Sequence, residues 1–352
     1  MAPRVESAGA LLSIADRDGE WASVRLSYHL RAPYPDQSFA RTDDGWGLWL
    51  PRPPVDRLEY LLEVGDHQGG THLVPDPTNP RRVGGVFGEH SVLEFPEYQA
   101  PAWLGWHAPD GERVEVDLPH GPGLRRDLPA QVWSPSGLGE APAPMLVVHD
   151  GPEMDAYAEV TRYSAAMVAA GVLPPHRVAL LAPLDRDAWY SASPAYARTL
   201  SDHAVPTLLD AWPTMGRPVL VGASLGALAG LHAELAGPGT FGGLFLASGS
   251  YFSMRYDSHE QQFGRFYRIA SAVERIVDAP TCPTATPIVL ACGTGEENWE
   301  NNRAMVTALR RAGASVTWRS FADGHTWVGW RDALDPALTS LLGSLWGEPT
   351  PG

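Results

Sequence analysis

The 352-residue sequence predicts an α/β domain, with a mostly parallel sheet covered by helices on both faces, that follows a small all-β sandwich domain. Residues 1 to about 100 contain short alternating or aromatic runs between Gly, Pro and Asp residues, without a helical period, which is typical of a sandwich. From Glu112 onward, apolar strand candidates alternate with helical candidates, which indicates a parallel sheet with covered faces. We therefore predict a sandwich domain over 1–100, a proline-interrupted linker over 101–112 and a catalytic domain over 113–352.

Each predicted element rests on a local pattern. In the first domain the strand candidates are the runs WASVRLSYHL, GWGLWLP, RLEYLLEV and SVLEF. In the second domain the apolar runs predict strands at 112–118, 126–135, 144–150, 177–183, 217–224, 242–250, 286–293 and 315–321. Helical segments are expected near 155–171, 194–213, 225–237, 300–313 and 332–346.

The charge composition excludes several classes of function. A net charge of −15, from 26 basic and 41 acidic residues, argues against a nucleic acid or an anionic membrane as partner, since both require a basic surface. The sequence contains no lysine, so Schiff-base, pyridoxal-phosphate and Walker-type phosphate chemistry are excluded. We expect an enzyme without a cofactor, and the sequence leaves the oligomeric state open.

The N-terminal segment and the cysteines bear on the compartment. Arg4 is followed by Glu6, Asp16 and Asp18, so we expect neither a signal peptide nor a membrane anchor. Cys282 and Cys292 flank a segment whose second half is a strand candidate, which would hold them too far apart for a disulfide. Two free thiols favour a cytoplasmic protein.

The segment 217–231, RPVLVGASLGALAGL, has the pattern Gly-x-Ser-x-Gly between a strand and a helix. In such an elbow a sharp turn exposes the serine hydroxyl above the sheet, and the flanking glycines allow close approach of neighbouring chain. Small residues that merely permit tight helix packing are the alternative explanation. Because the strand and helix context is correct, we interpret Ser224 as a nucleophile.

A serine nucleophile needs a base and an acid farther along the chain, in the order Ser, acid, His. His325 follows the strand candidate at 315–321 and precedes the last predicted helix. Glu296 and Glu297 follow the preceding strand candidate, and either carboxylate could orient the imidazole. We favour Glu296 over Glu297 and leave the choice open.

An oxyanion hole needs two N–H donors. The first candidate is Leu225, directly after the nucleophile. The second is Gly151 or Glu153, in the loop after the strand candidate at 144–150, because Pro152 between them has no N–H. His149 and Asp150 begin this loop; no further ligands at metal spacing accompany them, so we expect a structural role for both and no metal.

These segments resemble the esterase D-type putative esterase family, and within it the enterochelin (ferric enterobactin) esterase-like group. The resemblance rests on VVHDGPEM, on GASLGALAGL and on the region from GTGEENWE to RDAL, and it covers about residues 130 to 346. The group's signature GGHDW..WR is approximated by the run from Asp323 to Trp327 with Trp330 and Arg331; Thr326 stands where the signature has Asp. The resemblance implies an α/β-hydrolase fold, a cofactor-free serine esterase with Glu296 as the acid, an immunoglobulin-like N-terminal domain and a siderophore ester substrate.

Candidate substrate-binding residues are cationic or aromatic. A ferric catecholate siderophore is anionic and needs cations, although the chain as a whole is acidic. The candidates are Arg186 and Trp327, the latter from the signature. Two more are Tyr251 and Arg255, which lie in an aromatic segment where this fold commonly inserts a lid. The alternative for the aromatic segment is an amphipathic helix packed on the sheet.

The main hypothesis is therefore hydrolysis of a small-molecule ester, siderophore, aryl or acyl, through Ser224, His325 and Glu296. Acyl transfer by the same triad is a second possibility. A site that excludes water from the acyl-enzyme would distinguish an acyltransferase from a hydrolase. A non-catalytic binding protein with a relic hydrolase domain is the third; a fluorophosphonate probe for the nucleophile separates it from the others.

Overall fold

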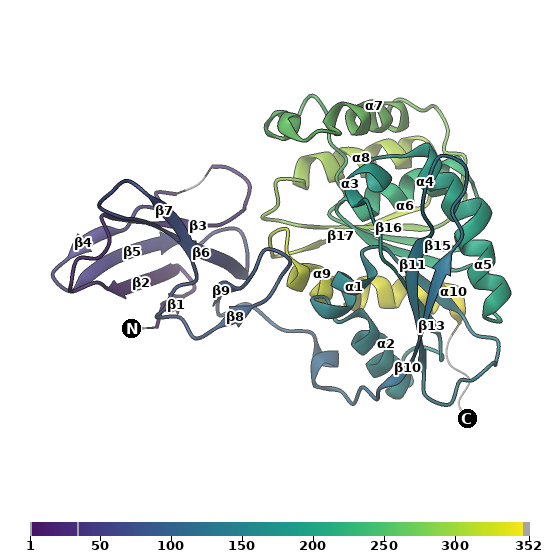
Figure 1. Cartoon of the computed structure of the whole chain (residues 1–352), viewed down its shortest axis with the longest axis horizontal. Helices are drawn as coiled ribbons and strands as arrows, with labels where there is room; N and C mark the ends of the chain where they lie inside the picture. Colours follow the sequence, from purple (N-terminus) through teal and green to yellow (C-terminus); the bar gives the residue numbers. More distant parts are fainter. Residues whose placement is uncertain (1, 34, 348–352) are drawn as a thin grey trace. The chain divides into compact units, whose positions relative to one another are not determined.

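The computed structural model describes residues 2–33 and 35–347, which form two compact units (Figure 1). The first unit comprises the chain up to Ala100 together with Gly293–Glu297 and Phe321–Gly329. The second comprises Pro101–Cys292, Asn298–Ser320 and the chain from Trp330 onward. The first unit therefore includes two short segments that lie far along the sequence, within the range predicted for the catalytic domain.

The N-terminal part of the first unit consists of two antiparallel sheets. One has the strand order β1-β2-β5-β4, and the other has the order β3-β6-β9-β8 with β7 paired to β6. The strands are β1 (Arg4–Glu6), β2 (Gly9–Ala15), β3 (Ser23–Ser27), β4 (Ala40–Thr42), β5 (Gly45–Pro51), β6 (Arg57–Gly65), β7 (Thr71–Val74), β8 (Arg82–Val83) and β9 (His90–Glu94).

Alternating side chains of both sheets meet in one core. In β6, every second residue from Leu58 to Val64 is buried, as the period of two in a strand requires. Leu12 of β2 and Leu50 of β5, in the other sheet, belong to the same buried cluster. The two sheets therefore form a sandwich around a common core, as the alternating sequence pattern predicts.

The second unit contains an eight-stranded mixed sheet with the order β10-β11-β13-β12-β14-β15-β16-β17. The strands from β13 to β16 pair in parallel, whereas β10 and β11 are antiparallel to their neighbours. Every residue of the five central strands is buried, so both faces of the sheet centre are covered. The strands are β10 (Gly111–Leu118), β11 (Leu128–Pro135), β12 (Met145–Val148), β13 (Arg177–Leu181), β14 (Val219–Ala223), β15 (Gly243–Ala247), β16 (Ile288–Gly293) and β17 (Val316–Phe321).

The helices connect successive strands, as the alternating pattern predicts. They are α1 (Gly151–Ala156), α2 (Val160–Ala169), α3 (Arg186–Tyr190), α4 (Pro194–Thr199), α5 (Val205–Ala211), α6 (Leu225–Ala236), α7 (Phe266–Val277), α8 (Trp299–Arg311), α9 (Trp327–Ala333) and α10 (Thr339–Trp346). Short 3₁₀ helices cover Ala102–Gly105 and Ser258–Gln262, and π-helical turns cover Leu200–Ala204 and Leu334–Leu338.

The structure divides three segments that the sequence predicts as continuous helices. Between α1 and α2, Glu159 adopts a left-handed conformation with φ 53° and interrupts the helix. Between α9 and α10, Asp335 leaves the helical region before Pro336, which has no N–H to continue the hydrogen-bond ladder. A π-helical turn separates α4 from α5. Apolar periodicity alone does not reveal such breaks.

Two further observations concern the whole chain. Cys282 and Cys292 are both free thiols, which agrees with the expectation from their spacing. Across residues 2–33 and 35–347, none of the helices combines the length and the apolar character that crossing a membrane requires.

Candidate active site

Ser224 occupies the turn between β14 and α6, with φ 54° and ψ −124°. A residue other than glycine pays about 1–3 kcal/mol for such a backbone conformation, so the surrounding structure must enforce it. The backbone N–H of Ser224 donates to the carbonyl of Ala247 in β15, 2.9 Å away, and thereby anchors the turn to the neighbouring strand. Ser224 thus has the strained strand-to-helix geometry that the sequence pattern predicts.

The two glycines of the pattern are needed for space. A Cβ on Gly222 would lie 2.6 Å from the carbonyl oxygen of Gly226, which is backbone and cannot move aside. A Cβ on Gly226 would lie 3.0 Å from Cβ of His149, in the loop after β12. The first glycine therefore lets the first turn of α6 lie directly on β14, and the second brings the loop after β12 against the same turn.

That loop contains the two candidates for the second oxyanion donor, whereas Leu225 lies at the start of α6. Asp150 has φ 50° and precedes α1, which begins at Gly151. The first N–H groups of a helix have no carbonyl partner within it, so the amides of Gly151, Glu153 and, at the start of α6, Leu225 are not used by their own helices. A Cβ on Gly151 would lie 2.4 Å from the carbonyl carbon of Leu180, so only glycine fits here. The choice between Gly151 and Glu153 stays open.

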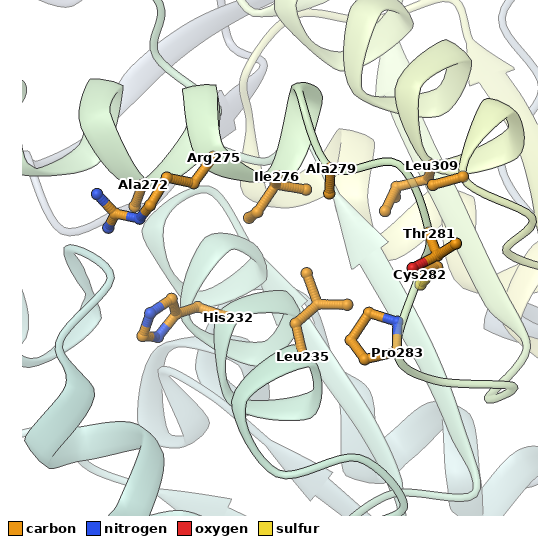
Figure 2. A pocket seen from close by; sticks show the side chains of 11 residues that line it. His232, Leu235, Ala272, Arg275, Ile276, Ala279, Thr281, Cys282, Pro283 and Leu309 are labelled. Atoms are coloured by element: carbon orange, nitrogen blue, oxygen red, sulfur yellow. The ribbon is translucent and has the colours of Figure 1, made fainter.

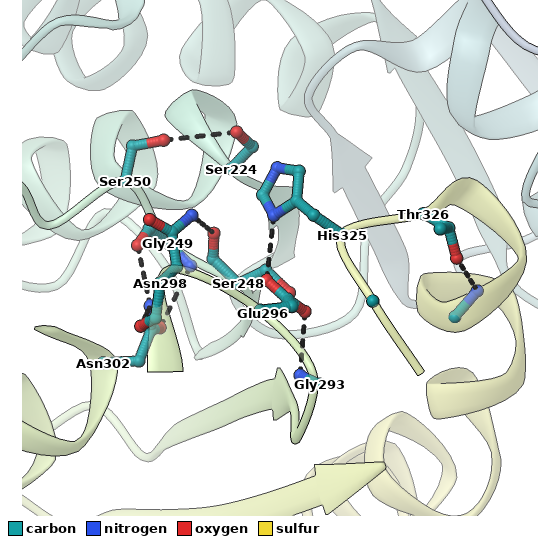
Figure 3. A network of polar contacts seen from close by, with 12 residues as sticks. Ser224, Ser248, Gly249, Ser250, Gly293, Glu296, Asn298, Asn302, His325 and Thr326 are labelled. Carbon is teal, nitrogen blue, oxygen red and sulfur yellow. Dashed lines mark hydrogen bonds and ion pairs between the residues drawn. The ribbon is translucent and has the colours of Figure 1, made fainter. Parts of the chain in front are cut away.

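His325 and Glu296 form a hydrogen-bonded pair in the first unit (Figure 3). The distance from Nδ1 of His325 to Oε2 of Glu296 is 2.8 Å, and Oε1 of Glu296 accepts a 2.8 Å hydrogen bond from the N–H of Gly293. Glu296 is buried, whereas the side chain of His325 is partly exposed. If Nδ1–H donates to the carboxylate, a neutral ring carries its lone pair on Nε2, the tautomer that a general base needs.

The order of the strands relates these residues to the nucleophile. Ser224 follows β14, and Glu296 and His325 follow β16 and β17, with β14, β15, β16 and β17 adjacent in that order in the sheet. In open α/β sheets, catalytic groups are found beyond the carboxyl ends of the strands. The candidate nucleophile, acid and base therefore all lie in segments that follow strands of one sheet.

Residues 122–341 match the family model described as "Putative esterase", which is more than half of the chain. The chain belongs to this esterase family. The match covers the segments that contain Gly151, Ser224, Glu296 and His325.

Curated relatives and solved structures agree with the family match. The esterase is 26% identical over 312 residues to the iron(III) enterobactin esterase of Escherichia coli K12, covering 82% of this chain and 72% of the relative. The enterobactin esterase of Dickeya dadantii is 27% identical over 292 residues, covering 76% of this chain and 65% of the relative.

Among solved structures, the ferric enterobactin esterase of Salmonella typhimurium has a TM-score of 0.77 at 18% identity, covering 97% of this chain and 96% of that one. The enterochelin esterase of Shigella flexneri has a TM-score of 0.76 at 20% identity, covering 98% of this chain and 96% of that one. At this level of identity the structures establish the shared α/β-hydrolase fold.

The esterase also has polar residues near Ser224, the candidate nucleophile, that the sequence patterns do not identify. The Oγ of Ser250, in the loop after β15, lies 3.2 Å from the Oγ of Ser224. The side chain of Asn302 bonds both the N–H and the carbonyl of Gly249, at 3.0 and 2.8 Å, while Nε1 of Trp330 donates to Oγ of Ser248. The run Ser-Gly-Ser after a buried strand is the only local signal for this loop.

His149 and Asp150 have structural roles, as the sequence predicts. Nδ1 of His149 lies 2.8 Å from the carbonyl oxygen of Gly226, and burial lowers the pKa of this histidine to about 4, so the ring is neutral near pH 7. Both carboxylate oxygens of Asp150 accept from Arg186, at 2.8 and 2.9 Å. Arg186, predicted to bind substrate, thus braces the loop through a bidentate ion pair.

The other predicted substrate-binding residues differ in their surroundings. Tyr251, which the sequence predicts as a substrate contact, has 1% of its surface exposed and belongs to the buried core cluster. Arg255 is exposed, with its guanidinium 5.0 Å from the ring centroid of Tyr256. Trp327, at the start of α9, lies against Gly85 in the first unit, at 3.6 Å from the position of an added Cβ.

The alternative interpretation, a helix packed on the sheet, holds only for the last part of the aromatic segment: the chain from Tyr251 forms turns and the 3₁₀ helix Ser258–Gln262, and α7 begins at Phe266. The rings of Phe252 and Phe266 stack with centroids 6.1 Å apart, and Phe266 begins α7 and is fully buried. Apolar side chains of α7 are part of the main core. Aromatic content alone did not distinguish a substrate-contacting flap from a packed helix.

A pocket of about 200 Å³ lies between α6, α7 and the chain that follows α7 (Figure 2). Its lining includes His232, Arg275 and Cys282 together with apolar side chains. It contains none of the residues predicted for catalysis or substrate binding, so we do not assign it to the active site.

We expect Gly222→Ala to destabilise the esterase by about 1–3 kcal/mol, because the new Cβ would overlap the backbone of Gly226. Thermal and urea unfolding measure the loss. Gly343→Ala in α10 is the matched control: no atom lies within 4 Å of its added Cβ, and alanine favours a helix by up to about 1 kcal/mol. Equal stability of the two variants would contradict the spatial role of Gly222.

Acid should destabilise the esterase over a defined range of pH. Burial lowers the pKa values of His149 and His176 to about 4 from 6.5, so between these values the unfolded chain binds protons that the folded chain does not. The free energy of unfolding is therefore greatest above pH 6.5 and falls, by about 1.4 kcal/mol per pH unit for each histidine, as the pH decreases toward 4.

Urea unfolding at several pH values between 7 and 4.5 measures this slope. His176→Asn removes one titrating group while its amide can replace the hydrogen bond from Nδ1 to the carbonyl of Pro174, so the slope should become shallower by about 1.4 kcal/mol per pH unit. His107→Asn, on an exposed side chain, is the control, and the slope should change more in His176→Asn than in His107→Asn. A wild-type slope for His176→Asn would contradict the assignment.

Proposed function

We propose that this esterase hydrolyses a carboxylic ester of a small molecule through a triad of Ser224, His325 and Glu296. The observation that carries the proposal is the strained conformation of Ser224 after β14, combined with the hydrogen-bonded pair of His325 and Glu296 after β16 and β17. A nucleophile, an oriented base and a buried carboxylate are the groups that acyl transfer to water requires.

The reaction would proceed in two steps. Nε2 of His325 accepts the proton of Ser224 while Oγ bonds to the ester carbonyl carbon, and Glu296 stabilises the resulting imidazolium. The amides of Leu225 and of Gly151 or Glu153 would hold the oxyanion. The leaving alcohol takes the proton from His325. A water molecule, deprotonated by His325, then attacks the acyl carbonyl carbon; the bond to Oγ breaks, Ser224 takes the proton back from His325, and the acid is released.

For the substrate we propose a siderophore or aryl ester. The relatives described as iron(III) enterobactin esterases support this class, since their likeness extends over 82% of this chain. The net charge of −15 means that an anionic ligand would depend on local arginines, of which Arg255 is an exposed example.

We also propose the division into an N-terminal domain over 1–100 and a catalytic domain after a linker at 101–112, with the N-terminal sandwich of the immunoglobulin-like class. Two sheets around a common core support that class. The free thiols of Cys282 and Cys292 support a cytoplasmic location.

The test combines turnover with labelling of the nucleophile. We expect hydrolysis of p-nitrophenyl esters from acetate to octanoate, hydrolysis of a catecholate trilactone, and a single fluorophosphonate adduct that peptide mass spectrometry assigns to Ser224. Absence of both turnover and adduct would overturn the proposal in favour of a binding protein. If turnover depended on an added alcohol acceptor and the product were a new ester, the enzyme would be an acyltransferase instead.

A further inference from the structure

We infer that the N-terminal sandwich positions the acid and the base of this esterase, and that Arg57 is the central positioning residue. The inference rests on the proposed function of His325 and Glu296. It assigns the N-terminal sequence a part in catalysis that involves no contact with the substrate.

Backbone hydrogen bonds join both catalytic loops to the N-terminal sequence within the first unit. The N–H of Arg31 donates to the carbonyl of Gly295, 2.7 Å away, in the loop that contains Glu296. The N–H of Asp56 donates to the carbonyl of Ala322, 2.6 Å away, in the loop that contains His325. The acid loop is therefore fixed one residue before Glu296, and the base loop is fixed three residues before His325.

Side-chain packing strengthens the attachment of the acid loop. Oγ1 of Thr294 donates to the carbonyl of Pro54 at 2.8 Å. A Cβ on Gly295 would lie 2.5 Å from Val55 and 2.8 Å from Leu30, both buried in the core of the sandwich. Close packing of this kind leaves the loop little freedom to move independently of the sandwich.

Arg57, the first residue of β6, provides the charged contact. Its side chain is 3% exposed, and Nη1 lies 2.8 Å from Oε1 of Glu59 and 3.4 Å from Oδ2 of Asp323. Burial by itself would lower the pKa of Arg57, but these two carboxylates raise it above its usual value. The guanidinium is therefore charged and compensated by its partners.

Asp323 connects Arg57 to the histidine. Its Oδ1 accepts from the N–H of Gly324 at 2.6 Å and from Oγ1 of Thr326 at 3.3 Å, the residues on either side of His325. Its carbonyl oxygen accepts from the N–H of Gly295 in the acid loop, at 3.2 Å. Asp323 thus joins the two catalytic loops to each other and, through Arg57, to the sandwich.

The signature that this chain resembles has an Asp directly after the histidine, where this chain has Thr326. Here the carboxylate of the turn belongs to Asp323, before the histidine, and Thr326 bonds to it. The carboxylate of this turn therefore lies within reach of Arg57.

Loss of the guanidinium would leave the carboxylates of Glu59 and Asp323 close to one another without a compensating charge. Unpaired buried charge is unfavourable, so the turn around His325 would rearrange. Displacement of a catalytic group by about 1 Å is enough to reduce a rate by about 100-fold. The effect should fall on kcat rather than on KM, because Arg57 acts through the base and not on the substrate.

The test uses the full chain with the p-nitrophenyl ester that the wild type hydrolyses fastest. We expect Arg57→Gln and Asp323→Asn each to lower kcat roughly 10- to 100-fold, with KM within about twofold of the wild-type value. Arg57→Lys restores the charge without the planar fork, so its kcat should lie between those of Arg57→Gln and the wild type. Fluorophosphonate labelling should slow in parallel with kcat.

Arg41→Gln is the matched control. Arg41 pairs with buried Asp16 in the same sandwich at 2.7 Å, away from the catalytic loops, so its loss should lower the melting temperature and leave kcat unchanged. The inference fails if Asp323→Asn and Arg57→Lys both retain the wild-type kcat, or if Arg41→Gln lowers kcat as much as Arg57→Gln. If Arg57→Gln does not fold, Arg57→Lys and Asp323→Asn decide. Ser224→Ala, run alongside, shows separately whether the proposed function holds.

Discussion

Replacement of Ser224 by alanine is expected to lower kcat for ester hydrolysis by roughly 10⁴- to 10⁶-fold, because the variant lacks the hydroxyl on which the proposed acyl-enzyme forms. The remaining rate would come from binding and from the oxyanion donors alone. The fold should be retained, because the substitution removes a hydroxyl whose contact in the structure is with Oγ of Ser250, 3.2 Å away. Steady-state kinetics, with intact-mass measurement after fluorophosphonate treatment, test the prediction.

Ser250→Ala is the control for this experiment, since it removes the neighbouring hydroxyl. Loss of one hydrogen bond corresponds to about 0.5–1.5 kcal/mol, so this variant should keep at least roughly a tenth of the activity and should still be labelled. Full activity in Ser224→Ala, or an adduct on Ser250 in place of Ser224, would show that the nucleophile is misassigned.

Glu296→Gln should lower kcat by about 10⁴-fold, although the size and shape of the side chain change little. The carboxylate now accepts from the N–H of Gly293 and faces Nδ1 of His325 at the same time. An amide has one acceptor oxygen, so one of these partners would face an NH₂ group, and the negative charge that stabilises the imidazolium would be lost.

Glu297→Gln provides a control at the adjacent position. Glu297 is exposed, and the same loss of charge there should change kcat by less than about twofold. A large loss in Glu297→Gln together with a small loss in Glu296→Gln would reverse the assignment of the acid.

Part of this site could be predicted from the sequence because its signals are local. The elbow at Ser224 needs a strand, small flanking residues and a helix within one short run, and the structure has all of these. His325 and Glu296 were predicted from chain order, since the connections of a parallel sheet bring successive strand ends to one edge. The hydrogen bond between the two side chains agrees with that reasoning.

What the sequence did not indicate depends on long-range packing. Arg57 and Asp323 are 266 positions apart, and each alone is an unremarkable charged residue in a loop or strand. The aromatic run near Tyr251 has the composition of a binding surface, but Tyr251 and Phe252 are buried, whereas Tyr256 is exposed. Whether an aromatic faces a ligand or the core depends on the neighbours that cover it, which local periodicity does not specify.

The first compact unit is discontinuous in sequence, since it combines the chain up to Ala100 with Gly293–Glu297 and Phe321–Gly329. A single cut in the chain near residue 100 therefore does not separate this unit from the rest of the esterase. A hybrid that joins the N-terminal hundred residues of a homologue to the remaining chain would have to reproduce the backbone contacts of Arg31 and Asp56 and the side-chain contact of Arg57. An active hybrid has to exchange the two later loops together with the sandwich. The hydrogen bonds between these segments, and not their order in the chain, therefore decide which residues must be exchanged together.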